Sequence, residues 1–187
     1  KNVSYWFNDF PGQPAWLTSS VVPLLFGAYE KYYGIKNLMT KAIRPEYLET
    51  AKKIYNKEIK WDEVTYPNQD GEGLLGLPVK PRDMITGEFL RQYNKGEGAF
   101  YRKTIKNTAL EVEYPENNYF FGGSKDTIVP LAISVDIPTA FQESLGSTTV
   151  KGINTGDGAT HSSTFLASLY GMRNEPTNNI LAWFASN

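Results

Sequence analysis

One acid and one base in this sequence are placed so that they could work together in proton transfer. His161 is the only histidine of the chain, so any imidazole base must be this residue. Asp126 follows one apolar segment, and His161 follows the next. An imidazole that donates one N–H to a carboxylate keeps its other nitrogen available to take a proton from a nucleophile. A lone histidine is more often an ordinary surface or core residue, but an acid and a base that follow successive strands favour catalysis.

The elements expected to bring these residues together are strand, helix and strand. Residues 119–121 predict a first strand that ends in two glycines ahead of Asp126, and residues 148–153 predict a second strand ahead of the loop that carries His161. The helical segment between them ends at Gly146, and its apolar residues are Leu131, Ile133, Val135, Phe141 and Leu145. A right-handed crossover makes the two strands parallel, so both loops are expected at the sheet edge where α/β proteins bind ligands.

Two other acids are weaker candidates for the partner of His161. Asp136 is expected inside a buried part of the helical segment. Asp157 is close to His161 in sequence, but its loop is expected to be solvated or to position the histidine. Asp126 is therefore the predicted acid.

The run Gly-Gly-Ser-Lys-Asp-Thr-Ile-Val-Pro at residues 122–130 resembles the acid loop of the α/β-hydrolase family. Leu145-Gly146 before the last strand and a histidine that opens the last helix also fit, so the resemblance covers about residues 115–172. Upstream, Val21–Gly34 resembles a cap segment of some secreted bacterial esterases, lipases and related peptidases. The resemblance implies an α/β fold: the C-terminal part of an α/β-hydrolase sheet with a mainly α-helical cap.

The chain departs from this family at the nucleophile. The family's serine lies in Gly-x-Ser-x-Gly on a sharp strand-to-helix turn, and no such motif occurs here. The nearest run, Gly122-Gly123-Ser124, falls at the acid position instead. The serine and the oxyanion hole are therefore expected from an N-terminal half of the same hydrolase, as a separate chain or another segment.

The composition excludes several classes of function. A net charge of −1 without strong charge runs gives no electrostatic reason to expect nucleic-acid binding. The absence of cysteine excludes disulfides, cysteine-ligated zinc and thiol catalysis. No apolar run approaches the roughly 20 residues of a transmembrane helix. Residues 68–72 lack the ligand pattern of an EF-hand, and we expect neither a metal nor a cofactor.

Helical periodicity dominates the first part of the chain, and we expect a helical cap over residues 1–112 and the hydrolase core over 113–187. Residues 1–18 predict an irregular aromatic arm because prolines interrupt it. Helices are expected at residues 20–33, 45–56, 86–94 and 98–107, with a loop-rich connection at 60–80. The last core helix is expected to bury Phe165, Leu166, Leu169 and Tyr170, and a closing helix is expected at 177–185.

The sequence thus predicts a serine hydrolase subunit or fragment that acts on small carboxylic esters with acyl or lipid-like groups. Asp126 orients His161, and His161 activates the serine that comes from outside this chain. Two alternatives remain open: a peptidase of the same family, and a non-catalytic binding module with an aromatic surface, which the 26 aromatic residues (12 Tyr, 10 Phe and 4 Trp) could form. The compartment is undetermined, and only the cap resemblance favours secretion or the periplasm.

Overall fold

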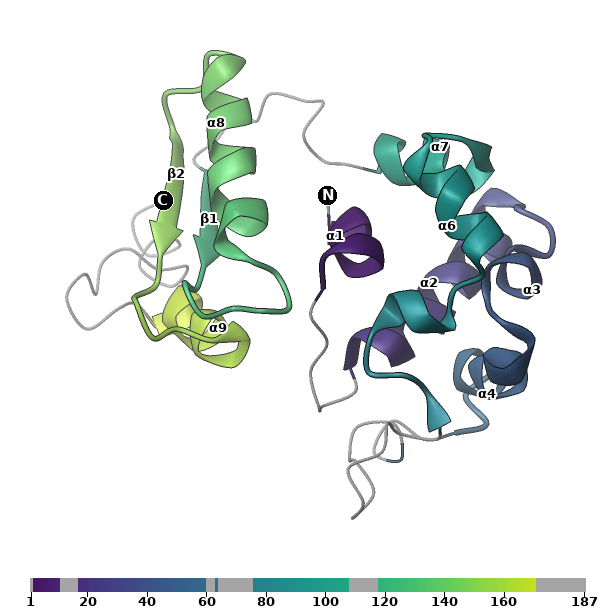
Figure 1. Cartoon of the computed structure of the whole chain (residues 1–187). Helices are drawn as coiled ribbons and strands as arrows, with labels where there is room; N and C mark the ends of the chain where they lie inside the picture. Colours follow the sequence, from purple (N-terminus) through teal and green to yellow (C-terminus); the bar gives the residue numbers. More distant parts are fainter. Residues whose placement is uncertain (1, 11–16, 60–62, 64–75, 108–117, 171–187) are drawn as a thin grey trace. The chain divides into compact units, whose positions relative to one another are not determined.

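The computed structural model describes residues 2–10, 17–59, 63, 76–107 and 118–170. The chain divides into two compact units, Lys1–Thr108 and Ala109–Asn187. The described residues form a mixed, mostly helical structure with one small parallel sheet of two strands (Figure 1). The expected cap–core boundary at residues 112 and 113, the EF-hand-like run at 68–72 and the closing helix at 177–185 lie outside the described residues.

The first unit, called the helical unit below, is built from short helices. Its described elements are α1 (Asn2–Asn8), α2 (Leu17–Tyr33), α3 (Leu38–Ala42), α4 (Pro45–Tyr55), the 3₁₀ turn η2 (Pro81–Met84), α6 (Gly87–Asn94) and α7 (Gly98–Lys106). An isolated antiparallel bridge between Ile43 and Ile85 joins the α3–α4 connection to the residue that follows η2. Thr86 caps α6 by accepting a hydrogen bond from the backbone N–H of Phe89.

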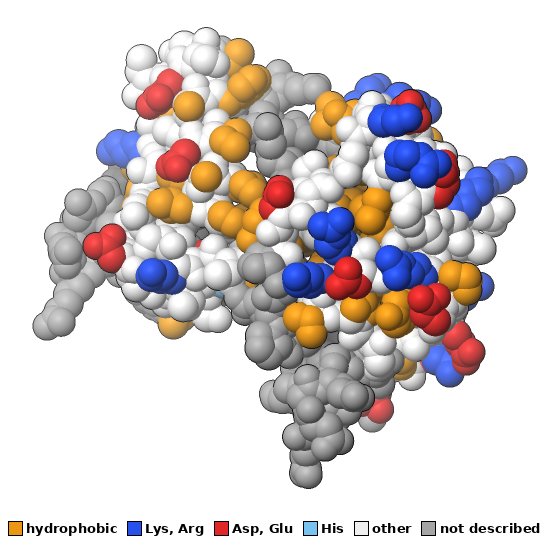
Figure 2. Space-filling model, in the orientation of Figure 1, with side chains coloured by type: hydrophobic (Ala, Val, Ile, Leu, Met, Phe, Trp, Pro, Cys, Tyr) orange, Lys and Arg blue, Asp and Glu red, His pale blue; other side chains and the backbone are white. Residues whose placement is uncertain are grey.

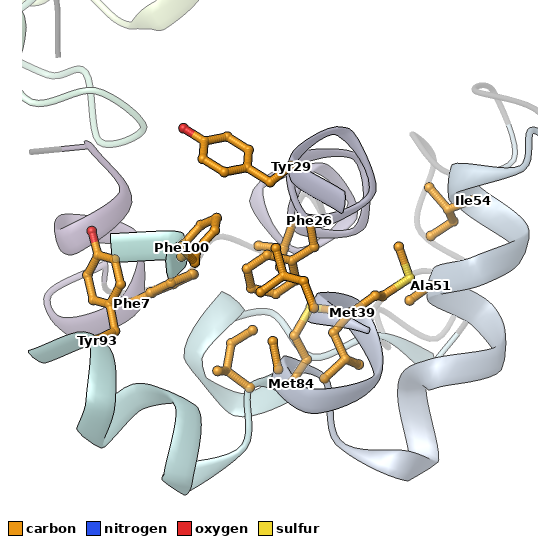
Figure 3. Packing of buried hydrophobic residues seen from close by; sticks show 14 of the residues in the cluster. Phe7, Phe26, Tyr29, Met39, Ala51, Ile54, Met84, Tyr93 and Phe100 are labelled. Atoms are coloured by element: carbon orange, nitrogen blue, oxygen red, sulfur yellow. The ribbon is translucent and has the colours of Figure 1, made fainter. Parts of the chain in front are cut away.

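Aromatic rings form the centre of this unit (Figure 3). Phe7 and Phe26 are completely buried, and their ring centroids are 6.1 Å apart. Phe100 lies 5.2 Å from Phe26 and 5.9 Å from Tyr93 between ring centroids. Burial raises the pKa of the Tyr93 hydroxyl, which keeps this ring neutral within the core. Rings from α1, α2, α6 and α7 thus hold the helical unit together by apolar burial.

Two expectations for the start of the chain were wrong. Residues 2–8 form helix α1 rather than part of an irregular arm, because the prolines that disfavour a helix begin only at Pro11. Helix α2 begins at Leu17, three residues before the expected start at residue 20, and Pro23 lies inside the helix. On α2 the side chains of Val22, Phe26 and Tyr29 are buried, whereas Tyr32 is 76% exposed.

The second unit, called the sheet unit below, contains the predicted strand–helix–strand arrangement. Its described elements are β1 (Asn118–Gly122), the π-helical segment η3 (Ala132–Asp136), α8 (Ile137–Ser144), β2 (Val150–Asn154) and α9 (His161–Tyr170). β1 and β2 pair in parallel with Phe120 opposite Gly152, which confirms the predicted strand direction. Figure 1 draws both arrows pointing to the same end of the pair, the end at which α9 lies.

Glycines let the helical segment approach the sheet closely. A Cβ atom on Gly122 would lie 2.7 Å from Val135, and one on Gly152 would lie 2.7 Å from both Val135 and Thr139. Ordinary side chains at these positions would push η3 and α8 off the strands. In the π-helical segment η3 the N–H of Ile137 bonds the carbonyl of Ala132, five residues earlier, and Pro138, which has no N–H, follows directly.

The outer helices of the sheet unit correct two further expectations. α9 buries the polar residues Thr164 and Ser168, whereas Phe165 is 63% and Leu166 is 55% exposed. Apolar periodicity identified this helix, but it did not identify the face that packs against β1. Asp136, expected in a buried part of the helical segment, is exposed.

The described surface carries charges of both signs, and the described helices do not suit a membrane span. Figure 2 shows acidic and basic side chains interspersed over the helical unit rather than gathered by sign. Among the described residues, no helix combines the length and hydrophobicity that crossing a bilayer requires.

The aromatic core of the helical unit predicts a large stability difference between two positions of α2. Phe26→Ala removes a fully buried ring and should lower the free energy of unfolding by about 3–5 kcal/mol. Tyr32→Ala on the same helix is the matched control and should stay within about 0.5 kcal/mol of the parent, because Tyr32 is mostly exposed. Urea unfolding of both variants measures the difference, and equal effects would contradict the assignment of this core.

Candidate functional site

Asp126 lies on the loop after β1 and is almost completely buried. Its side chain is 4% exposed. One carboxylate oxygen, Oδ1, accepts hydrogen bonds from the backbone N–H groups of Ile128 and Val129, both at 2.9 Å. These two bonds fix the orientation of the carboxylate, so its second oxygen points to a defined place.

His161 occupies that place. Its Nδ1 atom lies 2.9 Å from Oδ2 of Asp126, which is the contact that the sequence predicts. His161 is the first residue of α9, and its side chain is 50% exposed, so the ring has one nitrogen at the buried acid and one edge toward solvent. Among the described residues, no group forms a hydrogen bond with Nε2. A ring that donates Nδ1–H to the carboxylate therefore presents Nε2 as an open proton acceptor.

Backbone and side-chain hydrogen bonds hold the two loops of this pair against each other. The N–H of Lys125 donates to the carbonyl of Ala159 at 2.9 Å, and the hydroxyl of Ser124 donates to the carbonyl of Gly156 at 2.7 Å. Where the strands end, the N–H of Thr155 donates to the carbonyl of Gly122 at 2.8 Å. The acid and the base are thus attached to one hydrogen-bonded surface rather than to two independent loops.

Gly123 allows the loops to approach this closely. A Cβ atom at this position would lie 2.3 Å from the carbonyl oxygen of Ala159 and 2.4 Å from Oγ1 of Thr164. Backbone cannot yield as a flexible side chain can, so only glycine fits between the acid loop and α9. The sequence pattern placed Gly123 at the end of a strand but did not show this packing role.

The other acids considered for the site do not contact the histidine. Asp136 lies in η3 and Asp157 lies in the loop after β2, and both are exposed. The described serines nearest in sequence are also engaged elsewhere or make no bond to the ring. The Oγ of Ser163 accepts the N–H of Thr160 at 2.8 Å, and Ser124 is used in the loop contact above. No hydrogen bond joins His161 to a serine among the described residues.

Sequence reasoning missed one pair of residues near the site, Thr155 and Thr164. Their Oγ1 atoms lie 3.1 Å apart, between the end of β2 and the first turn of α9. The only signal in the sequence was the spacing of three residues between His161 and Thr164, which places both on neighbouring positions of one helix face.

Comparison of the chain with protein-family models, with curated proteins and with solved structures found no match.

The packing of Gly123 predicts a position-specific effect of adding one methyl group. Gly123→Ala should lower the free energy of unfolding by about 1–3 kcal/mol, because the new Cβ collides with backbone. Gly158→Ala in the same region is the matched control, since a Cβ at that position meets nothing within 4 Å, and it should be nearly neutral. Thermal or urea unfolding compares the two variants. Equal stabilities would show that the two loops are not packed as described.

Proposed function

We propose that this chain supplies the acid and the base of a serine hydrolase that acts on carboxylic esters. One observation carries the proposal: the only histidine of the chain bonds a buried carboxylate through Nδ1 and leaves Nε2 open. This arrangement lies where two parallel strands end, which is the usual place for the site of an open α/β sheet.

The chemistry follows from the two ring nitrogens. Nε2 of His161 takes the proton of a serine hydroxyl while the serine oxygen forms a bond to the ester carbonyl carbon. The imidazolium that results is stabilised by the carboxylate of Asp126, which stays ionised. The same proton then passes from Nε2 to the leaving alkoxide as its bond to the carbonyl carbon breaks. In the second half of the cycle, Nε2 takes a proton from water as the water oxygen bonds the acyl carbon. It returns that proton to the serine oxygen as the serine–acyl bond breaks, and the acyl group leaves as a carboxylic acid.

The serine and the oxyanion hole come from a second polypeptide segment, the N-terminal half of the same hydrolase. The sequence contains no Gly-x-Ser-x-Gly turn, and no described serine bonds His161. We propose that β1 and β2 are two strands of a larger α/β-hydrolase sheet, to which the second segment contributes the rest. The helical unit is then the cap.

The hydrogen bonds of β1 support a particular edge of the sheet as the place where this segment would pair. The N–H of Asn118 and the carbonyl of Gly122 bond to the chain of β2, at Thr149 and Thr155. In a parallel pair, alternate residues of a strand bond opposite neighbours, so the backbone groups of Tyr119 and Phe121 face away from β2. In the part of the chain that the structure describes, no strand pairs with this edge of β1, so its backbone groups suit pairing with another strand.

The two edges of the pair differ in character. Lys151, Gly152 and Asn154 of β2 are exposed, and an exposed lysine is typical of a strand that ends a sheet. The residues of β1 are half-buried or buried. This difference supports β2 as the terminal strand and β1 as the strand that continues the sheet.

Exposed apolar side chains on the outer helices also support a partner. Phe165 and Leu166 of α9 are more than half exposed, Phe141 of α8 is 37% exposed, and Leu145, which directly follows α8, is 40% exposed. Figure 2 shows hydrophobic side chains on the surface along the α8 side of the sheet unit. Covering such surface stabilises an obligate complex, whose interfaces commonly bury thousands of Å² in total.

An ester hydrolase is favoured over the alternative of an aromatic binding module. The phenylalanine and tyrosine rings at the centre of the helical unit pack against one another instead of forming a surface. The hydrogen bond between the buried Asp126 and the half-exposed His161, in contrast, has no purpose that a binding module requires. An ester is preferred to an amide because its leaving group departs without the stronger general-acid assistance that an amine needs.

The proposal predicts that hydrolysis depends on His161 when the serine-bearing segment is present. In a preparation containing both polypeptides, His161→Gln should reduce the hydrolysis of a short-chain nitrophenyl ester by roughly 10²- to 10⁴-fold. Asp157→Asn is the matched control, because this exposed acid lies four residues from His161 and does not contact it, and it should retain activity. A fluorophosphonate should label a serine outside this chain. Labelling of a serine within this chain, or activity unaffected by His161→Gln, would contradict the proposal.

A second prediction concerns the chain by itself. The purified 187-residue chain should hydrolyse the same ester no faster than its own His161→Gln variant, because no described serine forms a hydrogen bond with His161. Sedimentation should show self-association, since the apolar side chains of α8 and α9 are then uncovered. A soluble, well-folded monomer that hydrolyses the ester through His161 would remove the need for a second segment.

A further inference from the structure

We infer that Thr164, acting with Thr155, is a positioning residue that holds His161 at the distance from Asp126 that the hydrogen bond requires. The catalytic meaning of this inference rests on the proposed function, whereas the geometric claim concerns the sheet unit alone. Neither threonine bonds the imidazole or the carboxylate, so both act through the placement of α9.

The hydroxyl groups form a directed chain from α9 to the end of β1. The Oγ1–H of Thr155 donates to the carbonyl of Gly122 at 3.1 Å. A hydroxyl has one proton, so in the contact between the two threonines at 3.1 Å, Thr164 is the donor and Thr155 the acceptor. The resulting order is Thr164 to Thr155 to the carbonyl of Gly122, and successive bonds of this kind polarise and strengthen one another.

The location of Thr164 explains why this chain of bonds affects the histidine. Thr164 follows His161 by three residues, so the two side chains project from neighbouring positions one turn apart, about 4.5 Å along the helix axis. A helix held only through His161 could rotate about its own axis and withdraw the ring. A second contact one turn further along fixes that rotation.

The loop that carries Asp126 lies in close contact with Thr164. Gly123 is so close that a Cβ atom there would lie 2.4 Å from the Thr164 hydroxyl oxygen, and Asp126 follows three residues later. Thr164 itself is only 9% exposed. The threonine therefore touches the loop that carries the acid while it belongs to the helix that carries the base.

Valine separates the shape of Thr164 from its hydroxyl group. Thr164→Val keeps the branched side chain but removes the donor, so the oxygen of Thr155 no longer accepts a hydrogen bond from residue 164. Thr164→Ser keeps the donor and removes only a methyl group. Thr139→Val is a matched control in the same unit, because Oγ1 of Thr139 is buried and has no hydrogen-bond partner among the described residues.

The test is the rate at which the Nδ1 proton of His161 exchanges with water, measured by proton NMR at low temperature on the full 187-residue chain. The chain has one histidine, so one such downfield signal is expected, and Asp126→Asn should remove it. Thr164→Val should accelerate the exchange roughly three- to tenfold, as expected for the loss of one hydrogen bond. Thr164→Ser and Thr139→Val should retain the parent rate.

The outcomes separate this inference from the proposed function. A parent chain without the Nδ1 signal would overturn both, because the acid–base pair would then be absent. A parent signal that Thr164→Val leaves unchanged, in a variant whose amide spectrum stays dispersed, would overturn the positioning role alone. If Thr164→Val does not fold, Thr155→Val decides the question, since it breaks the same bond from a half-buried position, and an unchanged exchange rate there would overturn the inference.

Discussion

A buried carboxylate needs hydrogen-bond donors, and the sheet unit is arranged around meeting this need at Asp126. Removing an ionised group from water costs several kcal/mol unless hydrogen bonds replace the lost hydration. The backbone N–H groups of Ile128 and Val129 donate hydrogen bonds to Oδ1, and Nδ1 of His161 forms the hydrogen bond to Oδ2. Each of the three distances is 2.9 Å. His161 is the first residue of α9, so it can reach Oδ2 only if this helix begins beside the acid loop. The lack of a side chain at Gly123 permits that approach, and the parallel pairing of β1 and β2 brings both loops to one end.

The two units depend on different forces, and the difference bears on function. Burial of aromatic rings such as Phe7, Phe26 and Phe100 stabilises the helical unit. In the sheet unit, short strands and a network of hydrogen bonds hold the loop of Asp126 against the loop that precedes α9. Apolar residues of α8 and α9 remain exposed. A network of this kind fixes the direction of a proton acceptor more tightly than apolar contacts can, because hydrogen bonds depend on angle as well as distance. Its exposed apolar surface favours association with the segment that we propose brings the serine.

Sequence reasoning reached the parts of this structure that local signals determine. The aromatic run before Gly122 and the apolar run before the Gly-rich loop predicted β1 and β2, and the crossover rule predicted that Asp126 and His161 would meet. Sequence reasoning failed to predict which side chains tertiary packing buries. Periodicity predicted α9 but assigned the exposed side chains of Phe165 and Leu166 to the core. The prolines at 11 and 14 led to an irregular arm being predicted for residues 1–18, although α1 ends before them at Asn8. The spacing of His161 and Thr164 was too weak a signal to reveal the hydroxyl chain through Thr155 and Thr164, because threonines at such spacing are common on exposed helices as well.

The protonation of the ring nitrogens of His161 tests the central claim most directly, since only a ring that donates through Nδ1 can act as a base through Nε2. Long-range proton–nitrogen NMR on the ¹⁵N-labelled chain, at a pH where the ring is neutral, reports which nitrogen carries the proton, and the single histidine makes the assignment unambiguous. The account predicts the proton on Nδ1 in the parent chain and on Nε2 in Asp126→Asn, where the new amide must donate to Nδ1 because its oxygen serves the backbone N–H groups. A parent ring protonated on Nε2 would contradict the account, because its solvent-facing nitrogen would then have no lone pair for the proton of a serine.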